Sequence, residues 1–354
     1  MKDLTKKLVG LSLAILLLIS LAGCGSNSSS TSPSSSSSAA SSNGGGTPAP
    51  AKLKVALLLP GPINDNGWNA SAYQGLKEAE KKFGIQGTYV ENVAQSDQLS
   101  KFRAFAQQGY DVIIGHGNEF GDAAKTVAKE FPKIKFIVTS TNITQPPNLG
   151  SLNVLSQQAG FFAGVAAQTL TKSNKVAYVG GMEIPPITAF ATGYKQGVKY
   201  ANSATGKNVQ VVGALTGSFE DVAKAKETAK TFISQGADVI IGNADQAGLG
   251  VIDAAKQAKV LDIGFGIDQS PLAPDLIPAS TVQSMPVAIE YVIKLINEGK
   301  WQPQYYPVGA AEGATGLVFN DKMKDKFSSS SMDLINKAID GVKSGQIDLS
   351  KLPQ

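Results

Sequence analysis

The fold is decided by two short stretches that are versions of one another. The first is GYDVIIG at residues 109–115, and the second is GADVIIG at residues 236–242. Each is a β-branched apolar run, too short for a buried helix and typical of a strand covered on both faces. Each lies between segments with helical periodicity, so both places predict the alternation of an α/β fold.

A second matched pair supports the same interpretation. The tripeptide KVA opens a predicted strand at 54–56 and again at 175–177. Both pairs are offset by roughly 120–130 positions, whereas solenoid repeats have periods of about 20–50 residues. We therefore interpret the chain as a duplicated α/β lobe. Ligands of open parallel sheets bind outside the carboxyl ends of the strands, so two facing lobes would direct both sets of loops into one cleft.

Composition excludes several classes of function. The chain has 354 residues, enough for two domains, and a net charge of +4. No basic stripe interleaved with aromatic residues occurs, so nucleic acid is not an expected partner. One Cys and one His exclude an internal disulfide, a Cys-based zinc cluster, most other metal sites and nearly all His-dependent catalysis. We expect no metal, no cofactor and no catalytic residue.

The N-terminus has the pattern of a bacterial lipoprotein signal. Three lysines within the first seven residues precede an apolar run at 8–21, and the sequence LAGC follows at 21–24. Because the chain's only Cys ends this lipobox, we predict a signal peptide at 1–23 and lipidation of Cys24. The protein would be anchored in the cell membrane on its extracytoplasmic face. The alternative is an uncleaved membrane anchor with an incidental Cys.

The segment after the lipobox is expected to be a tether. Residues 26–50 are rich in Ser, Gly and Pro and almost uncharged. Such a composition cannot bury a core, so we expect a flexible linker over 24–51 that spans roughly 25–30 Å.

From residue 53 onward, strand and helix patterns alternate, which indicates two mostly parallel sheets. Strands are predicted at 53–59, 87–91, 111–115, 135–139, 151–154, 175–180, 209–213, 238–241, 262–265, 305–309 and 315–318. Helices are predicted at 68–83, 97–108, 119–130, 157–171, 187–203, 220–235, 247–258, 285–298 and 331–343.

The loops that follow the strands supply the candidate ligand-binding residues. They carry aromatic rings for stacking and short polar side chains for directional hydrogen bonds. The candidates are Asp65, Trp68, Asn69, Asn118, Phe120, Phe190, Phe219, Asp245, Asp268 and Gln269.

Several of these residues also have a purely structural interpretation. Trp68 would otherwise cover the core, and Phe190 is as well suited to the core as to the cleft. Asp65 and Asp245 would otherwise cap helices. Asp268 and Gln269 would otherwise lie at a crossing between lobes. His116 fits a hydrogen-bonded loop histidine better than a ligand contact.

These loops, in this order behind a lipobox, resemble the basic membrane protein family of lipoproteins over about residues 52–320. The motifs that carry the resemblance are DNGWN at 65–69 with YQG at 73–75, QAGFFAG at 158–164, Phe190 with GY at 193–194, GSF at 217–219, GADVI at 236–240 with Gly248 and Gly250, and DQ at 268–269.

The resemblance implies a type I periplasmic-binding-protein-like fold, with two doubly wound parallel-sheet lobes around a ligand cleft and three crossings between them. It implies a substrate-binding protein of an ABC importer that holds purines or their nucleosides between aromatic rings. We expect one lobe at 52–155 plus 270–298 and the other at 156–269 plus 299–343.

Some positions differ from the nucleoside-binding members that this chain resembles. Those members have Phe where Trp68 stands, a Gly-Phe pair where Gly117 and Asn118 stand, an acidic residue near Gly266, and Lys where Gln283 stands. The acidic residue and the Lys belong to the sugar-recognising side. A free base such as adenine or hypoxanthine therefore fits at least as well as a nucleoside.

We expect a monomeric, non-enzymatic receptor that delivers a purine base or nucleoside to an ABC permease. The first alternative is a receptor for a sugar or another small polar ligand on the same fold. A nucleoside-processing enzyme is the second, and it would need a base or metal that this sequence does not supply. The third is a surface signalling or adhesion protein, which would keep the fold without needing a closed pocket.

Overall fold

The computed structural model describes residues 52–65 and 67–353. The signal peptide predicted at 1–23, the lipidated Cys24 and the tether predicted up to residue 51 lie outside the described residues. The described residues all belong to one compact unit, which begins after Ala49.

The first sheet has six strands in the order β11-β5-β4-β3-β1-β2, all paired in parallel. Its strands are β1 (Lys54–Leu58), β2 (Gln86–Val90), β3 (Val112–Gly115), β4 (Lys135–Thr139), β5 (Leu149–Val154) and β11 (Tyr305–Val308). The strand order reverses between β1 and β3, which is the switch point where open α/β sheets bind ligands.

The second sheet repeats this arrangement in the order β12-β10-β9-β8-β6-β7. Its strands are β6 (Lys175–Gly180), β7 (Gln210–Leu215), β8 (Val239–Asn243), β9 (Leu261–Gly266), β10 (Ala279–Gln283) and β12 (Thr315–Phe319). Only the edge pair β10–β12 is antiparallel. The matched sequence stretches form β3 and β8, which occupy equivalent places beside β1 and β6, so the predicted duplication is confirmed.

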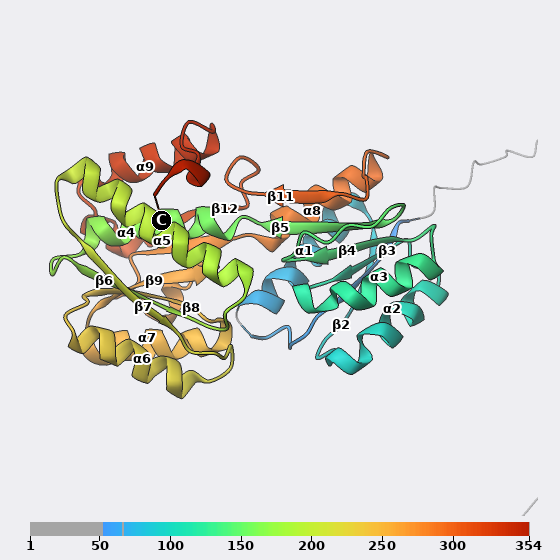
Figure 1. The fold of residues 1–354 in the computed structure, drawn as a ribbon, viewed down its shortest axis with the longest axis horizontal. Helices are drawn as coiled ribbons and strands as arrows, with labels where there is room; N and C mark the ends of the chain where they lie inside the picture. The colour runs from blue at the N-terminus through green and yellow to red at the C-terminus, as the bar shows by residue number, and fades with distance from the viewer. Residues whose placement is uncertain (1–51, 66, 354) are drawn as a thin grey trace, which may run out of the picture. The chain divides into compact units, whose positions relative to one another are not determined.

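Helices cover both faces of each sheet (Figure 1). They are α1 (Trp68–Phe83), α2 (Gln98–Gln107), α3 (Gly121–Glu130), α4 (Ser156–Leu170), α5 (Pro185–Thr205), α6 (Val222–Ser234), α7 (Gly248–Ala258), α8 (Met285–Asn297) and α9 (Ser329–Lys343). Short 3-10 turns occur at Gln95–Asp97, Asn118–Phe120, Asp245–Ala247, Ser270–Leu272, Asp321–Lys326 and Leu349–Lys351.

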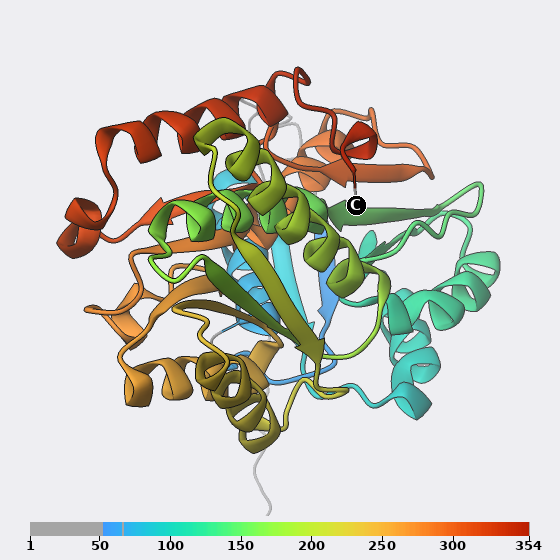
Figure 2. The same ribbon diagram turned by 60° about the vertical axis from the view of Figure 1, so that its left-hand side comes forward.

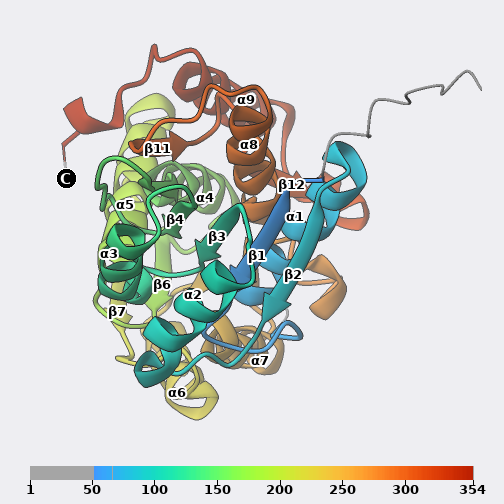
Figure 3. The ribbon, with the colours of Figure 1, turned by 90° about the vertical axis from the view of Figure 1, so that its right-hand side faces the viewer.

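Apolar residues from these helices form a core on each side of each sheet. Helices α1 and α8 pack on one face of the first sheet, and α2 and α3 pack on the other (Figure 3). Helices α4, α5 and α9 share one face of the second sheet (Figure 2), whereas α6 and α7 cover the opposite face. The strands between these layers are therefore buried on both sides, which explains their continuous apolar runs.

The chain crosses between the sheets three times. It crosses between β5 and α4, between β10 and α8, and between β11 and β12. The amide of Leu155 donates to Val308 O, and the amide of Ser284 donates to Ala314 O, so the crossings are hydrogen-bonded to one another. The number of crossings agrees with the family resemblance.

Two strands differ from the expected lobe boundaries. β10 pairs within the second sheet, although residues 270–298 were assigned to the first lobe, and β11 pairs within the first sheet, although residues 299–343 were assigned to the second. β10 has the sequence ASTVQ, with a single large apolar residue. Two of its buried polar side chains are hydrogen-bonded instead: Ser280 Oγ accepts from the amide of Gln269, and Thr281 Oγ1 donates to Ala159 O.

Helices α4 and α5 approach one another through glycine. Added Cβ atoms at Gly160 and Gly164 would meet the carbonyl oxygens of Phe190 and Tyr194, and those at Gly193 and Gly197 would meet backbone atoms of α4. Each helix therefore has two glycines spaced four residues apart on its contact face, where they let the two backbones touch.

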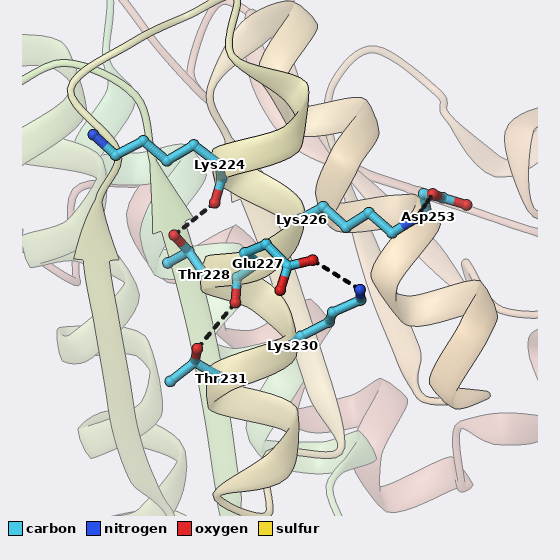
Figure 4. A network of polar contacts seen from close by, with 7 residues as sticks. All are labelled: Lys224, Lys226, Glu227, Thr228, Lys230, Thr231 and Asp253. Carbon is cyan, nitrogen blue, oxygen red and sulfur yellow. Dashed lines mark hydrogen bonds and ion pairs between the residues drawn. The ribbon is translucent and has the colours of Figure 1, made fainter.

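The outer surface of α6 is a solvated polar face (Figure 4). Lys226 forms an ion pair with Asp253 of α7, and Lys230 forms another with Glu227, at 2.8 Å. Side chains of this kind stabilise exposed helices by small amounts. Within the part of the chain that the structure describes, no helix has the length and apolar character needed to cross a membrane.

Candidate functional site

A cavity of about 620 Å³ lies between the two lobes, at the switch points of both sheets. This volume is within the range of small-molecule pockets. Its walls include the loops after β1, β3, β6 and β8, as the duplicated-lobe interpretation predicts. Seven of the ten candidate residues line it: Asp65, Trp68, Asn69, Asn118, Phe219, Asp245 and Gln269.

Asp65 organises the start of α1. Its Oδ1 accepts from the amides of Gly67 and Ala70, each at 2.9 Å, and its Oδ2 accepts from the amide and the side-chain nitrogen of Asn69, each at 2.8 Å. Amides in the first turn of a helix have no carbonyl acceptor within the helix, and here the carboxylate of Asp65 accepts their hydrogen bonds instead. Asp65 thus performs the capping role expected for it while it also borders the cavity.

The side chain of Asn69 forms its hydrogen bonds within the same loop. In addition to its bond to Asp65, its Oδ1 accepts from the amide of Gly61 at 3.3 Å, and its residue is only 4% exposed. Asn118, in the loop after β3, is exposed and borders the cavity. Of these two amide side chains, Asn118 is therefore the better placed to reach a ligand.

Trp68 stacks on His116. Their ring centroids are 4.2 Å apart and the planes are inclined by 23°. Trp68 lines the cavity, whereas His116 is fully buried behind it. The indole therefore rests on a rigid aromatic support, so that its orientation is fixed before a ligand arrives.

His116 is held by hydrogen bonds on both ring nitrogens. Nε2 lies 3.2 Å from Trp68 O, which only accepts, so Nε2 carries the proton. Nδ1 is then unprotonated and accepts from Thr139 Oγ1, 3.0 Å away, which itself accepts from the amide of Gly117. Burial lowers the pKa of His116 to about 3. His116 is a neutral, fully bonded support for Trp68, as its structural interpretation predicts.

Asp245 connects the second lobe to the first. Its Oδ1 lies 3.3 Å from the amide nitrogen of Trp68, which donates to it. An added Cβ at Gly67 would lie 2.5 Å from the same oxygen, so this approach requires glycine. Burial is the main cause that raises the pKa of Asp245 to about 7, and the negative charges of Asp65 and Glu220 act in the same direction.

Phe219 supplies an aromatic ring from the second lobe. It lies in the loop after β7, and its ring packs so closely on Gly181 that a Cβ there would overlap it. Gly180 ends β6 and Gly181 follows it at the switch point, and the spacing of these two glycines matches neither GxGxxG nor GxxxxGK(S/T), the phosphate-binding motifs. The glycine therefore accommodates an aromatic ring beside the cavity.

Three candidates lie elsewhere. Phe120 and Phe190 are packed in hydrophobic cores, Phe120 against Phe102 and Phe190 against Phe265, and both are outside the lining of the cavity. Phe190 thus takes the core position of its two alternatives. Asp268 accepts from the amide of Ser270 outside the lining.

The loop that contains Asp268 and Gln269 does not form a crossing. Gln269 Oε1 accepts from the amide of Phe265, so the loop folds back on its own sheet. The crossing follows β10, a strand absent from the sequence-based prediction that pairs with β9 before the chain leaves the second sheet.

Several lining residues were not among the candidates. Loops after β2 and β4 also reach the cavity, with Gln95, Gln98 and Ser140. These residues follow the carboxyl ends of strands, and this is the same position that identified the other loops as candidates. Glu119, Glu220 and Gln283 also line the cavity.

The cavity is acidic. Its lining contains the carboxyl groups of Asp65, Glu119, Glu220 and Asp245, and among the described lining residues there is no Lys, Arg or His. A phosphate or carboxylate on a ligand would meet no opposite charge here. The arrangement is suited to a neutral or cationic ligand with hydrogen-bond donors and a planar ring.

Comparisons with known proteins agree with this architecture. The nucleoside-binding protein BmpA of an ABC transporter in Lactococcus lactis subsp. cremoris is 29% identical over 80% of this chain and 85% of its own length. Basic membrane protein A of Borreliella burgdorferi is 30% identical over 80% of this chain and 86% of its own length. A solved ABC-transporter solute-binding protein from Aeropyrum pernix superposes with a TM-score of 0.73 at 24% identity, covering 84% of this chain and 92% of that protein.

The family model described as "ABC transporter substrate-binding protein PnrA-like" matches residues 52–349, which include both sheets and all the loops of the cavity. The chain therefore belongs to the PnrA-like family of ABC transporter substrate-binding proteins.

Proposed function

We propose that this protein captures a purine base or nucleoside between its lobes and delivers it to an ABC permease. One observation carries the proposal: each lobe contributes an aromatic side chain, Trp68 and Phe219, to the lining of one cavity. A planar base gains dispersion and stacking energy from such rings. The printed name of the Lactococcus relative, a nucleoside-binding protein, supports the same ligand class.

The polar lining would select among planar ligands. Asn118, Asp245 and Gln269 offer hydrogen-bonding groups of both kinds at the cavity, and an unmatched buried polar group costs roughly 1–3 kcal/mol. We identify no nucleophile paired with a general base among Asn118, Asp245 and Gln269. The ligand is therefore expected to leave unchanged, as a receptor requires.

The receptor would be held at the membrane by Cys24. The lipobox places the thiol of the chain's single Cys at the processing site, and several acyl chains on one residue give stable anchoring. The Ser-rich tether would then let the binding unit reach a permease in the same membrane.

The test is thermal unfolding of the full chain, purified in detergent, with a panel of purine bases, nucleosides and sugars. A ligand at 100 times its dissociation constant stabilises the folded state by about 2.7 kcal/mol. A shift with adenine or hypoxanthine alone would identify a base receptor, and a larger shift with nucleosides would identify a nucleoside receptor. A shift with sugars and none with purines would overturn the proposed ligand and leave the fold assignment intact.

A further inference from the structure

The contact between Asp245 and α1 joins residues 177 positions apart, across the cavity. Asp245 lies in the loop between β8 and α7, with φ of 49°, a left-handed conformation that is uncommon for a residue other than glycine. Uncommon backbone conformations of this kind cluster at ligand-binding sites and switch regions.

The partner of Asp245 is the one amide that Asp65 leaves unpaired at the start of α1. Asp65 accepts from the amides of Gly67, Asn69 and Ala70, and Asp245 accepts from that of Trp68. The next amide, that of Ser71, donates to Gly67 O. The cap of α1 is therefore completed only when the second lobe touches the first.

We propose that Asp245 is a positioning residue that holds the lobes closed, by completing the N-terminal cap of α1 from the opposite lobe and thereby fixing Trp68 against the ligand. The inference rests on the proposed function only in that closure encloses a ligand. Any separation of the lobes breaks this bond, whereas the bonds made by Asp65 stay within the first lobe.

Burial, and after it the acidic surroundings, make this contact sensitive to pH. The charged groups that face Asp245 are Asp65 from the start of α1 and Glu220 from the loop after β7, both negative. Among the described lining residues no cation offsets them. The pKa of Asp245 is about 7 with this contact formed, compared with an ordinary value of 3.8.

The direction of the pH effect follows from that difference. Opening exposes the carboxyl group to water, where its pKa falls, so closing the lobes takes up a proton between these two values. Closure, and with it ligand affinity, is expected to increase as pH falls. Between about pH 8.5 and about pH 5.5 the gain should be roughly ten-fold or more.

The first experiment observes the contact itself. The chain has two Trp residues, so labelling with ¹⁵N-tryptophan gives two backbone amide signals, which Trp301→Phe assigns. The Trp68 amide should titrate with a midpoint near 7 in the wild-type protein, alone or once adenosine is bound. It should not titrate in Asp245→Asn, whereas the Trp301 amide should be unaffected in both. If Asp245→Asn leaves the pH dependence of the Trp68 amide signal unchanged, both without ligand and with adenosine bound, the proposal is overturned.

The second experiment measures adenosine affinity over the same pH range for three variants. Asp245→Asn keeps an oxygen acceptor without a titrating proton, so it should bind with little pH dependence. Asp245→Ala removes the acceptor and should lose roughly ten-fold in affinity at low pH. Asp275→Asn, an exposed acid on the second lobe outside the cavity, should follow the wild type.

The two hypotheses fail in different ways. If adenosine and the other purines do not bind, the proposed ligand is wrong, and the Trp68 titration in the ligand-free protein decides the role of Asp245. If adenosine binds with the same pH profile in the wild type and in Asp245→Asn, the purine ligand stands and the closure role is wrong. Thermal unfolding of each variant confirms that it is folded.

Discussion

Gly164 of α4 lies directly against Tyr194 of α5, with the carbonyl oxygen of Tyr194 in the space that a Cβ on Gly164 would need. Gly164→Ala therefore forces the two helices apart. Overpacking of a core costs about 1–3 kcal/mol, more than the gain of up to about 1 kcal/mol from replacing Gly by Ala in a helix. We expect thermal unfolding to shift down by several degrees, or the variant to fail to fold.

The matched control for this substitution is Gly248→Ala. Gly248 is also helical, but the nearest atom to its added Cβ is Gly242 O at 3.5 Å, an ordinary contact. Its melting temperature should be unchanged or higher. Equal effects of the two substitutions would show that the backbone contact between α4 and α5 does not determine stability.

Trp68→Ala is expected to weaken purine binding by about ten-fold or more. The substitution removes the ring that lines the cavity and exposes the face of His116 on which it stacks. Trp68→Phe keeps a stacking surface and should lose less affinity. Isothermal titration with the best purine of the panel makes the comparison, and an unchanged dissociation constant for Trp68→Ala would remove this residue from the site.

Phosphorylated ligands are expected to bind much more weakly than their parent nucleosides. Four carboxyl groups border the cavity, and the described lining contains no cation to pair with a phosphate. Burying an unpaired charge is costly, so AMP should bind at least about 100-fold more weakly than adenosine. Titrations of both ligands at low and high salt provide the measurement. Comparable affinities would mean that the phosphate remains in water outside the cleft.

The imidazole of His116 is expected to stay neutral, with its proton on Nε2, from about pH 8 down to about pH 4. Burial disfavours the charged form, and both nitrogens already have partners. The sequence contains a single His, so ¹⁵N-histidine spectra report this ring alone. The same ring in urea-unfolded protein should titrate near its ordinary value of 6.5. A folded-state midpoint above about 5 would contradict the assigned bonds.

The difference between the folded and unfolded pKa values of His116 also makes the stability of the protein depend on pH. The unfolded chain binds a proton at His116 that the folded protein does not, so this residue makes the folded state less stable as pH falls from 6.5 toward 3. Asp245 acts in the opposite direction between 7 and 3.8, because there the folded state binds the extra proton. His116→Gln should therefore flatten the acid side of the stability profile, and Asp245→Asn should steepen it.

Sequence reasoning predicted most of the fold because the strands are buried on both faces. Apolar runs such as Val112–Gly115 and Val239–Asn243 stand out in the sequence, and α1 was predicted at its observed ends. β10 was missed because it buries Ser280 and Thr281, whose hydrogen-bond partners Gln269 and Ala159 lie 11 and 122 positions away, outside the strand. Because β10 pairs within the second sheet, the second lobe continues past the boundary that was expected at residue 270.

The site was predictable as a set of loops but not as a set of contacts. Trp68, Phe219 and Asp245 follow strands and reach the cavity, whereas Phe120 and Phe190 follow strands and point into cores. Position relative to a strand end does not determine which side of a helical turn faces the cleft. The pairing of Asp245 with α1 depends on how the two lobes meet, and no local pattern encodes it.

The pairing of β11 with β5 affects how the chain can fold as it is synthesised. The edge of β5 faces no strand until Tyr305–Val308 arrive, roughly 150 residues later. An open edge of this kind is a template for wrong pairing with other chains. The first sheet is therefore complete only when the chain reaches Val308, and the second, through β12, only when it reaches Phe319. Truncation before residue 305 would leave two unfinished sheets instead of one finished lobe, so the two halves of this duplicated protein cannot mature one after the other.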